Sequence, residues 1–160
     1  MESIKTLAYK DGKSYESLES QVLLFEVFDV QTSYSTDFSV ALDQLAFYGF
    51  KTGYESGFSN IALHTTHPHP SSIELISILK TPIQINETDA ILKFEEIVIV
   101  ETGEAGTSFG DEEFWDYVIV EGSTDGLNWI PFLDGYDSDA YPEWNSAYNS
   151  GSDGSPSLYK

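Results

Sequence analysis

The chain has 160 residues, which is the size of one domain and is enough to bury a hydrophobic core. Its 27 acidic and 7 basic residues give a formal net charge of −20, and every basic residue is a lysine. This charge repels nucleic-acid phosphates and anionic lipid headgroups, so we exclude nucleic acids and membrane surfaces as partners. Metal cations and basic patches on other proteins are the partners that such a surface attracts.

The absence of cysteine excludes disulfide bonds, thiolate metal ligands and a thiol nucleophile. The chain starts Met-Glu-Ser, without the basic and apolar regions of a signal peptide. Its longest apolar run, near residues 22–28, is too short to span a bilayer. We therefore expect no membrane insertion, and we expect any export signal to lie outside this chain.

The first predicted elements are β-strands, because β-branched and aromatic residues recur in short runs separated by Gly, Ser and Asp. Residues 38–50 fit either a strand or a short helix. Pro82 predicts an edge or a bend, and the pair Glu95 and Glu96 predicts a β-bulge. The predicted strands comprise residues 22–30, 60–65, 73–85 and 90–100.

The clearest local signal is a hairpin that joins residues 114–120 to residues 127–132. The dipeptide Asp125-Gly126 lies between these apolar runs and permits the positive φ of a tight turn. Trp115 and Trp129 flank the hairpin, and we expect both to fill the core. From residue 134 onward the chain is rich in Asp, Ser, Gly, Tyr and Asn, which predicts a loop.

These elements predict one all-β domain over residues 1–160, with residues 1–20 and 134–160 rich in loops. No stretch sustains a helical hydrophobic period. Short strands separated by turn residues are typical of a sandwich or barrel and argue against a parallel α/β sheet.

Several stretches in the second half of the chain share their order and spacing with a known family. They are residues 57–70 (GFSNIALHTTHPHP), 79–85 (LKTPIQI), 94–110 (FEEIVIVETGEAGTSFG) and 114–138 (FWDYVIVEGSTDGLNWIPFLDGYDS), followed by Trp144, Ala147 and Tyr148. Over this range the chain resembles jelly-roll accessory domains of large secreted and surface proteins of gliding-type bacteria, which are related in architecture to MAM and galactose-binding-like sandwiches.

The resemblance implies an antiparallel jelly-roll β-sandwich that serves as a non-catalytic module beside other domains. It carries no catalytic residue onto this chain, and it implies an extracellular or cell-surface location. In the family, further strands follow, including a segment rich in Arg, Trp and Gly. This chain stops at Lys160 before that point, so we expect the sandwich to lack its last strands.

His64, His67 and His69 lie together in the segment HTTHPHP. Imidazole is a common ligand of zinc, copper and iron. The spacings of three and two residues could bring two of these rings onto one ion, with an acidic neighbour as third ligand. Because Pro68 and Pro70 stiffen the segment and no HExxH motif is present, local packing of the rings is the alternative.

Two acidic segments are candidates for calcium, which prefers carboxylate and carbonyl oxygens on flexible loops. Neither segment has the spacing of an EF-hand loop, so a solvated acidic face is the alternative. Asp116 interrupts an apolar run, and a carboxylate there needs a partner. The first group is Glu101, Glu104, Asp111, Glu112, Glu113 and Asp116, and the second is Asp134, Asp137 and Asp139 with Asn145 nearby.

Aromatic residues in the polar C-terminal region are candidates for glycan binding, since exposed rings stack on sugars. These residues are Trp144, Tyr136, Tyr141 and Tyr148. For Trp144, local packing against the sandwich is the alternative.

The sequence therefore predicts a non-catalytic extracellular interaction or adhesion module of a multidomain surface protein, stabilised by calcium. Its expected partners are neighbouring domains and a glycan or protein ligand. No Gly-x-Ser-x-Gly motif and no distinguished pair of carboxylates supports an enzyme. The first alternative is a carbohydrate-binding module, and the second is a metal-dependent hydrolase that uses His64, His67 and His69.

Overall fold

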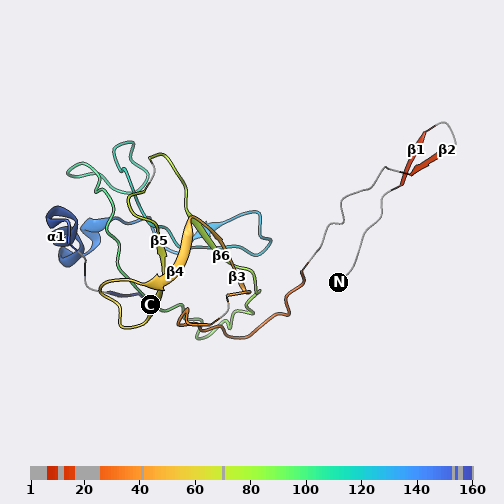
Figure 1. The fold of residues 1–160 in the computed structure, drawn as a ribbon, viewed down its shortest axis with the longest axis horizontal. Helices are drawn as coiled ribbons and strands as arrows, with labels where there is room; N and C mark the ends of the chain where they lie inside the picture. The colour runs from red at the N-terminus through yellow and green to blue at the C-terminus, as the bar shows by residue number, and fades with distance from the viewer. Residues whose placement is uncertain are drawn as a thin grey trace.

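The computed structural model describes residues 26–40, 42–69, 71–152 and 154, together with the backbone of three terminal strands. These strands are β1 (Leu7–Lys10), β2 (Lys13–Glu16) and β10 (Ser157–Tyr159). Between them lie β3 (Leu45–Tyr48), β4 (Phe50–Tyr54), β5 (Ile61–Thr65), β6 (Ile76–Leu79), β7 (Phe94–Glu96), β8 (Glu121–Gly122) and β9 (Ile130–Pro131). A 3-10 helix η1 (Ser138–Ala140) and an α-helix α1 (Pro142–Ser150) follow β9 (Figure 1).

The strands pair in two-stranded antiparallel ladders. Among the described residues these ladders are β1–β2, β3–β6, β4–β5, β7–β10 and β8–β9. A single parallel bridge joins Gln31 to Ile83, and an antiparallel bridge joins Val118 to Tyr136. The structure thus confirms a β-rich, antiparallel fold with little helix, whereas these narrow ladders do not by themselves define a jelly-roll sandwich.

Several predicted strands are shorter in the structure than their apolar runs. Residues 22–25 lie outside the described part of the chain, and residues 26–30 form no strand. The runs 73–85 and 90–100 form strands only over β6 and β7, apart from the single bridge of Ile83 to Gln31. β-Propensity reports how well a side chain fits a pleated surface, whereas a strand also needs a neighbouring backbone edge with which to pair.

The region 38–50 and the segment 60–65 hold strands β3, the start of β4, and β5, so a strand is confirmed there. The predicted bulge is wrong. Glu95 and Glu96 are in continuous register with Leu158 and Ser157 of β10, so neither residue is extra in the ladder.

A hairpin is present, but its first strand, β8, begins after the predicted run 114–120, and its connection is longer than a tight turn. Glu121 pairs with Pro131 and Gly122 with Ile130, which leaves residues 123–129 as the loop. Gly126 has the expected positive φ of 71°. Residues 114–117 form no strand, and instead the rings of Phe114 and Tyr117 stack with centroids 6.0 Å apart.

The C-terminal region was predicted to be a loop, and this prediction is wrong because α1 lies there. Pro142 occupies the first turn, where its missing N–H costs nothing. Gly151 ends the helix in the left-handed conformation at φ 64°, and its N–H contacts the carbonyls of Ala147 and Tyr148. The helix buries only Trp144 and Ala147, too few positions to give a clear periodic signal.

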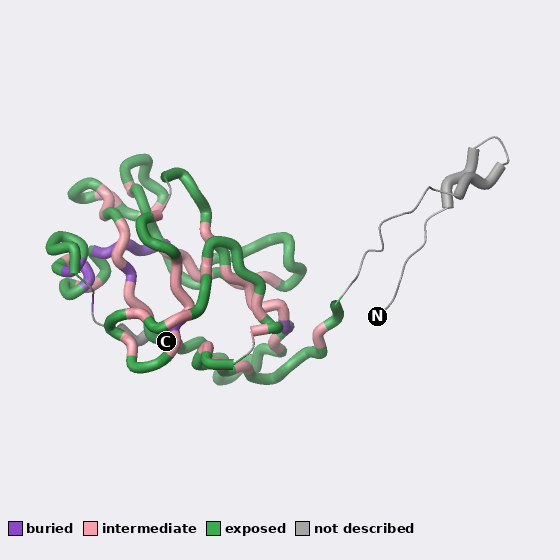
Figure 2. The backbone as a smooth tube through the Cα atoms, viewed as in Figure 1, coloured by how far each residue is buried: buried purple, intermediate pink, exposed green. Residues whose placement is uncertain are grey.

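The main buried cluster is built around α1. Val98, Tyr136 and Trp144 form its centre, and Figure 2 shows buried backbone near the end of the molecule that holds α1. The partly buried residues Ile97, Val100, Val118 and Tyr141 pack against it. The expectation that Trp115 and Trp129 fill the core is wrong, because they are 49% and 40% exposed.

Candidate functional site

The histidine segment begins on β5 and continues into the loop that follows it. His64 pairs with Lys51 across the β4–β5 ladder, so the two side chains share one face of the hairpin. Alternation along β4 places Gly53 on that face, and Glu55, the residue after β4, continues it. The fold therefore directs His64 and Glu55 to the same side.

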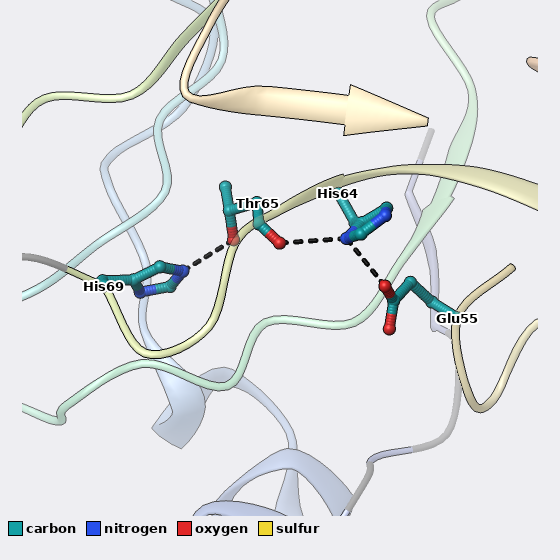
Figure 3. A network of polar contacts seen from close by, with 4 residues as sticks. All are labelled: Glu55, His64, Thr65 and His69. Carbon is teal, nitrogen blue, oxygen red and sulfur yellow. Dashed lines mark hydrogen bonds and ion pairs between the residues drawn. The ribbon is translucent and has the colours of Figure 1, made fainter. Parts of the chain in front are cut away.

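The His64 ring is held by two oxygen atoms at one of its nitrogens. Nδ1 lies 2.8 Å from Oε1 of Glu55 and 2.9 Å from the carbonyl oxygen of Thr65. Both partners are acceptors, so Nδ1 carries the proton and donates. Figure 3 shows His64 and Glu55 directed toward each other.

Gly53 leaves the space that this ring occupies. A Cβ atom at position 53 would lie 3.1 Å from Nε2 of His64. Any side chain there would press on the ring, so glycine is part of what lets His64 lie across β4.

His67 and His69 extend the cluster into the loop. The ring centroids of His64 and His67 are 6.5 Å apart, and those of His67 and His69 are 5.4 Å apart. Nε2 of His69 lies 2.6 Å from Oγ1 of Thr65, on the other side of Thr65 from His64 (Figure 3). Burial lowers the pKa of His69, the nearby His67 lowers it further, and Asp116 opposes both effects.

The ligand atoms of Glu55, His64 and His67 all lie within 4.8 Å of one another. This geometry agrees with the prediction that two of the histidines and an acidic neighbour gather at one place, and His69 is outside the group. Sequence reasoning missed Glu55, which precedes His64 on the same hairpin and lies outside the segment HTTHPHP. The available signal was the alternation Gly53, Glu55 on the strand that pairs with His64.

His67 also borders an open groove that contains two of the first-group acidic residues. Glu101 and Asp116 line this groove together with His67 and His69. The remaining lining residues are Pro68, Ile99, Val100 and Tyr148. The structure thus places Glu101 and Asp116 of the predicted calcium group beside the histidine loop. Tyr148 of the predicted glycan group lines the same groove.

The other residues of the first acidic group, Glu104, Asp111, Glu112 and Glu113, do not gather into one cluster with Glu101 and Asp116. Asp111 accepts hydrogen bonds from the backbone N–H and the hydroxyl of Ser108. Among the described residues, Glu55, His64 and His67 are the only acidic and histidine side chains gathered as a group of three within 4.8 Å. Calcium binding by Glu101, Glu104, Asp111, Glu113 and Asp116 stays a prediction, and it would need these carboxylates to move together.

In the second acidic group, Asp137 has a structural role. It is buried, its Oδ2 accepts from the N–H of Gly103 at 3.0 Å, and its Oδ1 accepts from the N–H of Asp139 at 2.8 Å. Asp139 in turn accepts a hydrogen bond from the Asn145 side chain. These contacts connect η1 to the loop at residue 103, and Asp134 lies exposed outside them.

For two residues of the predicted glycan group, Trp144 and Tyr136, the prediction is contradicted by burial. Trp144 is fully buried and Tyr136 is 8% exposed, so neither ring has a face for a sugar. The alternative of local packing is confirmed for Trp144, on which Tyr141 packs edge-to-face with centroids 4.6 Å apart.

A surface that sequence reasoning missed covers the second half of the hairpin loop and the residues that follow it. Leu127, Trp129, Ile130, Phe132 and Leu133, hereafter the hairpin surface, are between 39% and 83% exposed. Asp125 orders the loop, because its carboxylate accepts from the backbone N–H groups of Leu127 and Asn128, both at 2.8 Å. These hydrogen bonds lower the pKa of Asp125.

No known protein family, curated protein or solved structure matches the chain. The resemblance to jelly-roll accessory domains therefore stays a prediction that rests on the sequence stretches themselves. Within the part of the chain that the structure describes, no helix has the length and apolar character needed to cross a membrane.

Proposed function

We propose that the protein is a non-catalytic interaction module of a larger extracellular protein and that it docks a partner protein on the hairpin surface. The observation that carries this proposal is the exposure of five large apolar side chains within residues 127–133. A monomer rarely leaves such a concentration of apolar groups in water unless the surface has a binding role.

Local order supports the same proposal. The Phe132 ring lies over Gly122, where an added Cβ would be 2.5 Å from the ring, and the N–H of Phe132 bonds to the carbonyl of Val120. Asp125 fixes the loop at the other end. A surface ordered before binding loses less conformational entropy when a partner docks.

Charge restricts the chemistry of the partner. With a net charge of −20, the protein repels acidic proteins and attracts basic ones over long distances. The partner that fits is a protein with an apolar patch bordered by lysine and arginine. The extracellular setting rests on the sequence resemblance.

A jelly-roll sandwich is the architecture that we propose for the domain. Two ladders join strands that are not neighbours in the sequence, β3 with β6 and β7 with β10. Such crossing connections between antiparallel strands are a feature of Greek-key and jelly-roll folds.

Glycan binding is the second candidate function. Trp115 and Trp129 replace the buried Trp144 as the aromatic residues that would contact the sugar. Both indole rings are partly exposed, and exposed tryptophan rings are suited to stacking on sugars. Retention on a glycan array that is lost in Trp115→Ala or Trp129→Ala would favour this candidate over protein docking.

The experiment that tests protein docking compares two isoleucines of equal exposure. Ile130 on the hairpin surface is 69% exposed, and Ile91, outside it, is 67% exposed. A photo-reactive amino acid is placed at each position in the full-length protein made by its native host. We expect a discrete cross-linked product from position 130 and none from position 91.

Competition with unlabelled chain completes the test. Excess wild-type chain and the Ile91→Asp variant should suppress the product, whereas Ile130→Asp should not. Equal cross-linking from both positions, or no product from position 130, would overturn the proposed docking surface. Circular dichroism of the two aspartate variants establishes that both are folded.

A further inference from the structure

We propose that Glu55, His64 and His67 form a binding site for a divalent transition-metal ion, with zinc as the best match. The site lies on the β4–β5 hairpin and the loop after it, and the proposal is independent of the hairpin surface.

The ligand set suits zinc. Two imidazole nitrogens and one carboxylate oxygen are a common protein ligand set for this ion, whereas calcium and magnesium prefer oxygen ligands alone. Zinc holds such ligands at about 2.0–2.2 Å, so two of them lie about 3.3–4 Å apart around one ion. The three ligand atoms here lie within 4.8 Å of one another, so small side-chain rotations complete the site.

The hairpin positions two of the three ligands before any ion arrives. His64 is on β5, Glu55 follows β4, and the ladder between these strands fixes their separation. The side chains of His64 and Glu55 are 12% and 33% exposed, so both have restricted freedom. When zinc binds a ring nitrogen of His64, a proton carried by that nitrogen leaves to solvent.

His67 makes the site accessible. It is exposed and lines the open groove with Glu101 and Asp116. An ion can enter from this side, and the acidic groove raises its local concentration. Three protein ligands leave a fourth position for water, so the bound ion would tie the loop after β5 to the hairpin while it stays in contact with solvent.

The test uses the full chain without a polyhistidine tag, titrated with zinc chloride in a calorimeter. We expect one zinc ion per chain. Because loss of an outer-shell partner already costs about 10–100-fold in affinity, loss of a ligand in His67→Ala or Glu55→Gln should cost about 100-fold or more. The matched control is Glu87→Gln, an exposed glutamate in another segment, which should bind zinc as the wild type does.

Nitrogen-15 NMR of the imidazole rings provides a readout that does not depend on any variant. Zinc should shift one ring nitrogen each of His64 and His67. Zinc that binds without shifting these nitrogens, or with equal affinity in Glu87→Gln and Glu55→Gln, would overturn the site. Absence of stoichiometric binding to the folded wild-type chain would overturn it as well.

Discussion

The hydroxyl of Ser138 donates to the carbonyl of Val100 at 2.7 Å and accepts from the N–H of Val100 at 2.9 Å. The Ser138 side chain therefore provides hydrogen-bond partners for both the N–H and the carbonyl of Val100. In a β-sheet the backbone of a neighbouring strand would provide these partners. Ser138 is fully buried, so water cannot replace it in this role.

Replacing this serine should destabilise the fold. Ser138→Ala leaves the N–H and the carbonyl of Val100 without the hydroxyl partner, which should lower the free energy of unfolding by about 1–3 kcal/mol. Urea denaturation measures the change. The control is Ser146→Ala at an exposed position of α1, where we expect no loss; equal stability of the two variants would contradict the role of Ser138.

Removing the central indole should cost more. Trp144 is fully buried beside Val98 and Tyr136, and Trp144→Ala should lower the free energy of unfolding by about 3–5 kcal/mol. Trp129, which is 40% exposed, serves as the matched control, because Trp129→Ala removes less buried surface and should lower the free energy of unfolding by less than Trp144→Ala does. Iodide quenching of fluorescence should also spare Trp144 and reach Trp129 in the native protein.

The stability of the protein should depend on pH through Glu96. Burial raises the pKa of Glu96 from its ordinary value of 4.5 to about 7, and the Tyr136 hydroxyl opposes this shift in part. Between these two pKa values the folded state holds a proton that the unfolded state has released. Stability from this group therefore falls as pH rises through that window and is constant above it.

The size of this effect is on the order of 2 kcal/mol, because the carboxyl group is not fully enclosed and each pKa unit is worth about 1.4 kcal/mol. The wild-type protein should lose this amount of unfolding free energy between pH 5 and pH 8 through Glu96. The Glu96→Gln variant should not show this loss, because glutamine does not titrate. Its neighbour Glu95 is exposed on β7, and Glu95→Gln should keep the loss. The same pH profile in both variants would refute the assignment to Glu96.

Asp125 should control the order of the hairpin loop. In Asp125→Ala the N–H groups of Leu127 and Asn128 lose their acceptor, so both amides should exchange hydrogen faster while the melting temperature changes little. Asp125→Asn keeps one acceptor oxygen and should show an intermediate rate. Unchanged protection of these two amides in the alanine variant would show that the loop is ordered by other contacts.

Calcium dependence is tested most directly by thermal unfolding with calcium and then with EDTA. A ligand that prefers the native state raises the melting midpoint. If Glu101, Asp111 and Asp116 take part in a calcium site, calcium should raise the midpoint, and Asp111→Asn should reduce the gain. If the melting midpoint is the same with calcium and with EDTA, the calcium prediction is wrong, and the acidic residues form a solvated surface without a bound ion.

Local patterns in the sequence predicted several features correctly. β5 follows from its β-branched and apolar residues, Gly126 from the need for positive φ, and the approach of His64 to His67 from their short spacing. Each of these depends on contacts between residues that are close along the chain.

The features that sequence reasoning missed depend on how segments of the chain pair and pack against one another. Trp129 lies in an apolar run and Trp144 in a polar stretch, yet only Trp144 is enclosed, because it lies on α1 and packs with Val98. Glu55 reaches His64 only after β4 and β5 pair in a particular register. The residues next to Trp144 or Glu55 in the sequence do not predict these contacts. The register of a strand and the burial of a side chain depend also on the segment that packs against them.

The position of the buried cluster along the chain has a consequence for folding kinetics. Val98, Tyr136 and Trp144 all come from the C-terminal half, whereas the buried Ala62 belongs to β5 on the separate β4–β5 ladder. Segments close in sequence meet at a lower entropic cost. Val98 and Trp144 are far apart along the chain, whereas β4 and β5 are consecutive strands of one hairpin. The β4–β5 ladder should therefore form first, so that substitutions at Ala62 slow folding, while substitutions at Trp144 mainly speed unfolding.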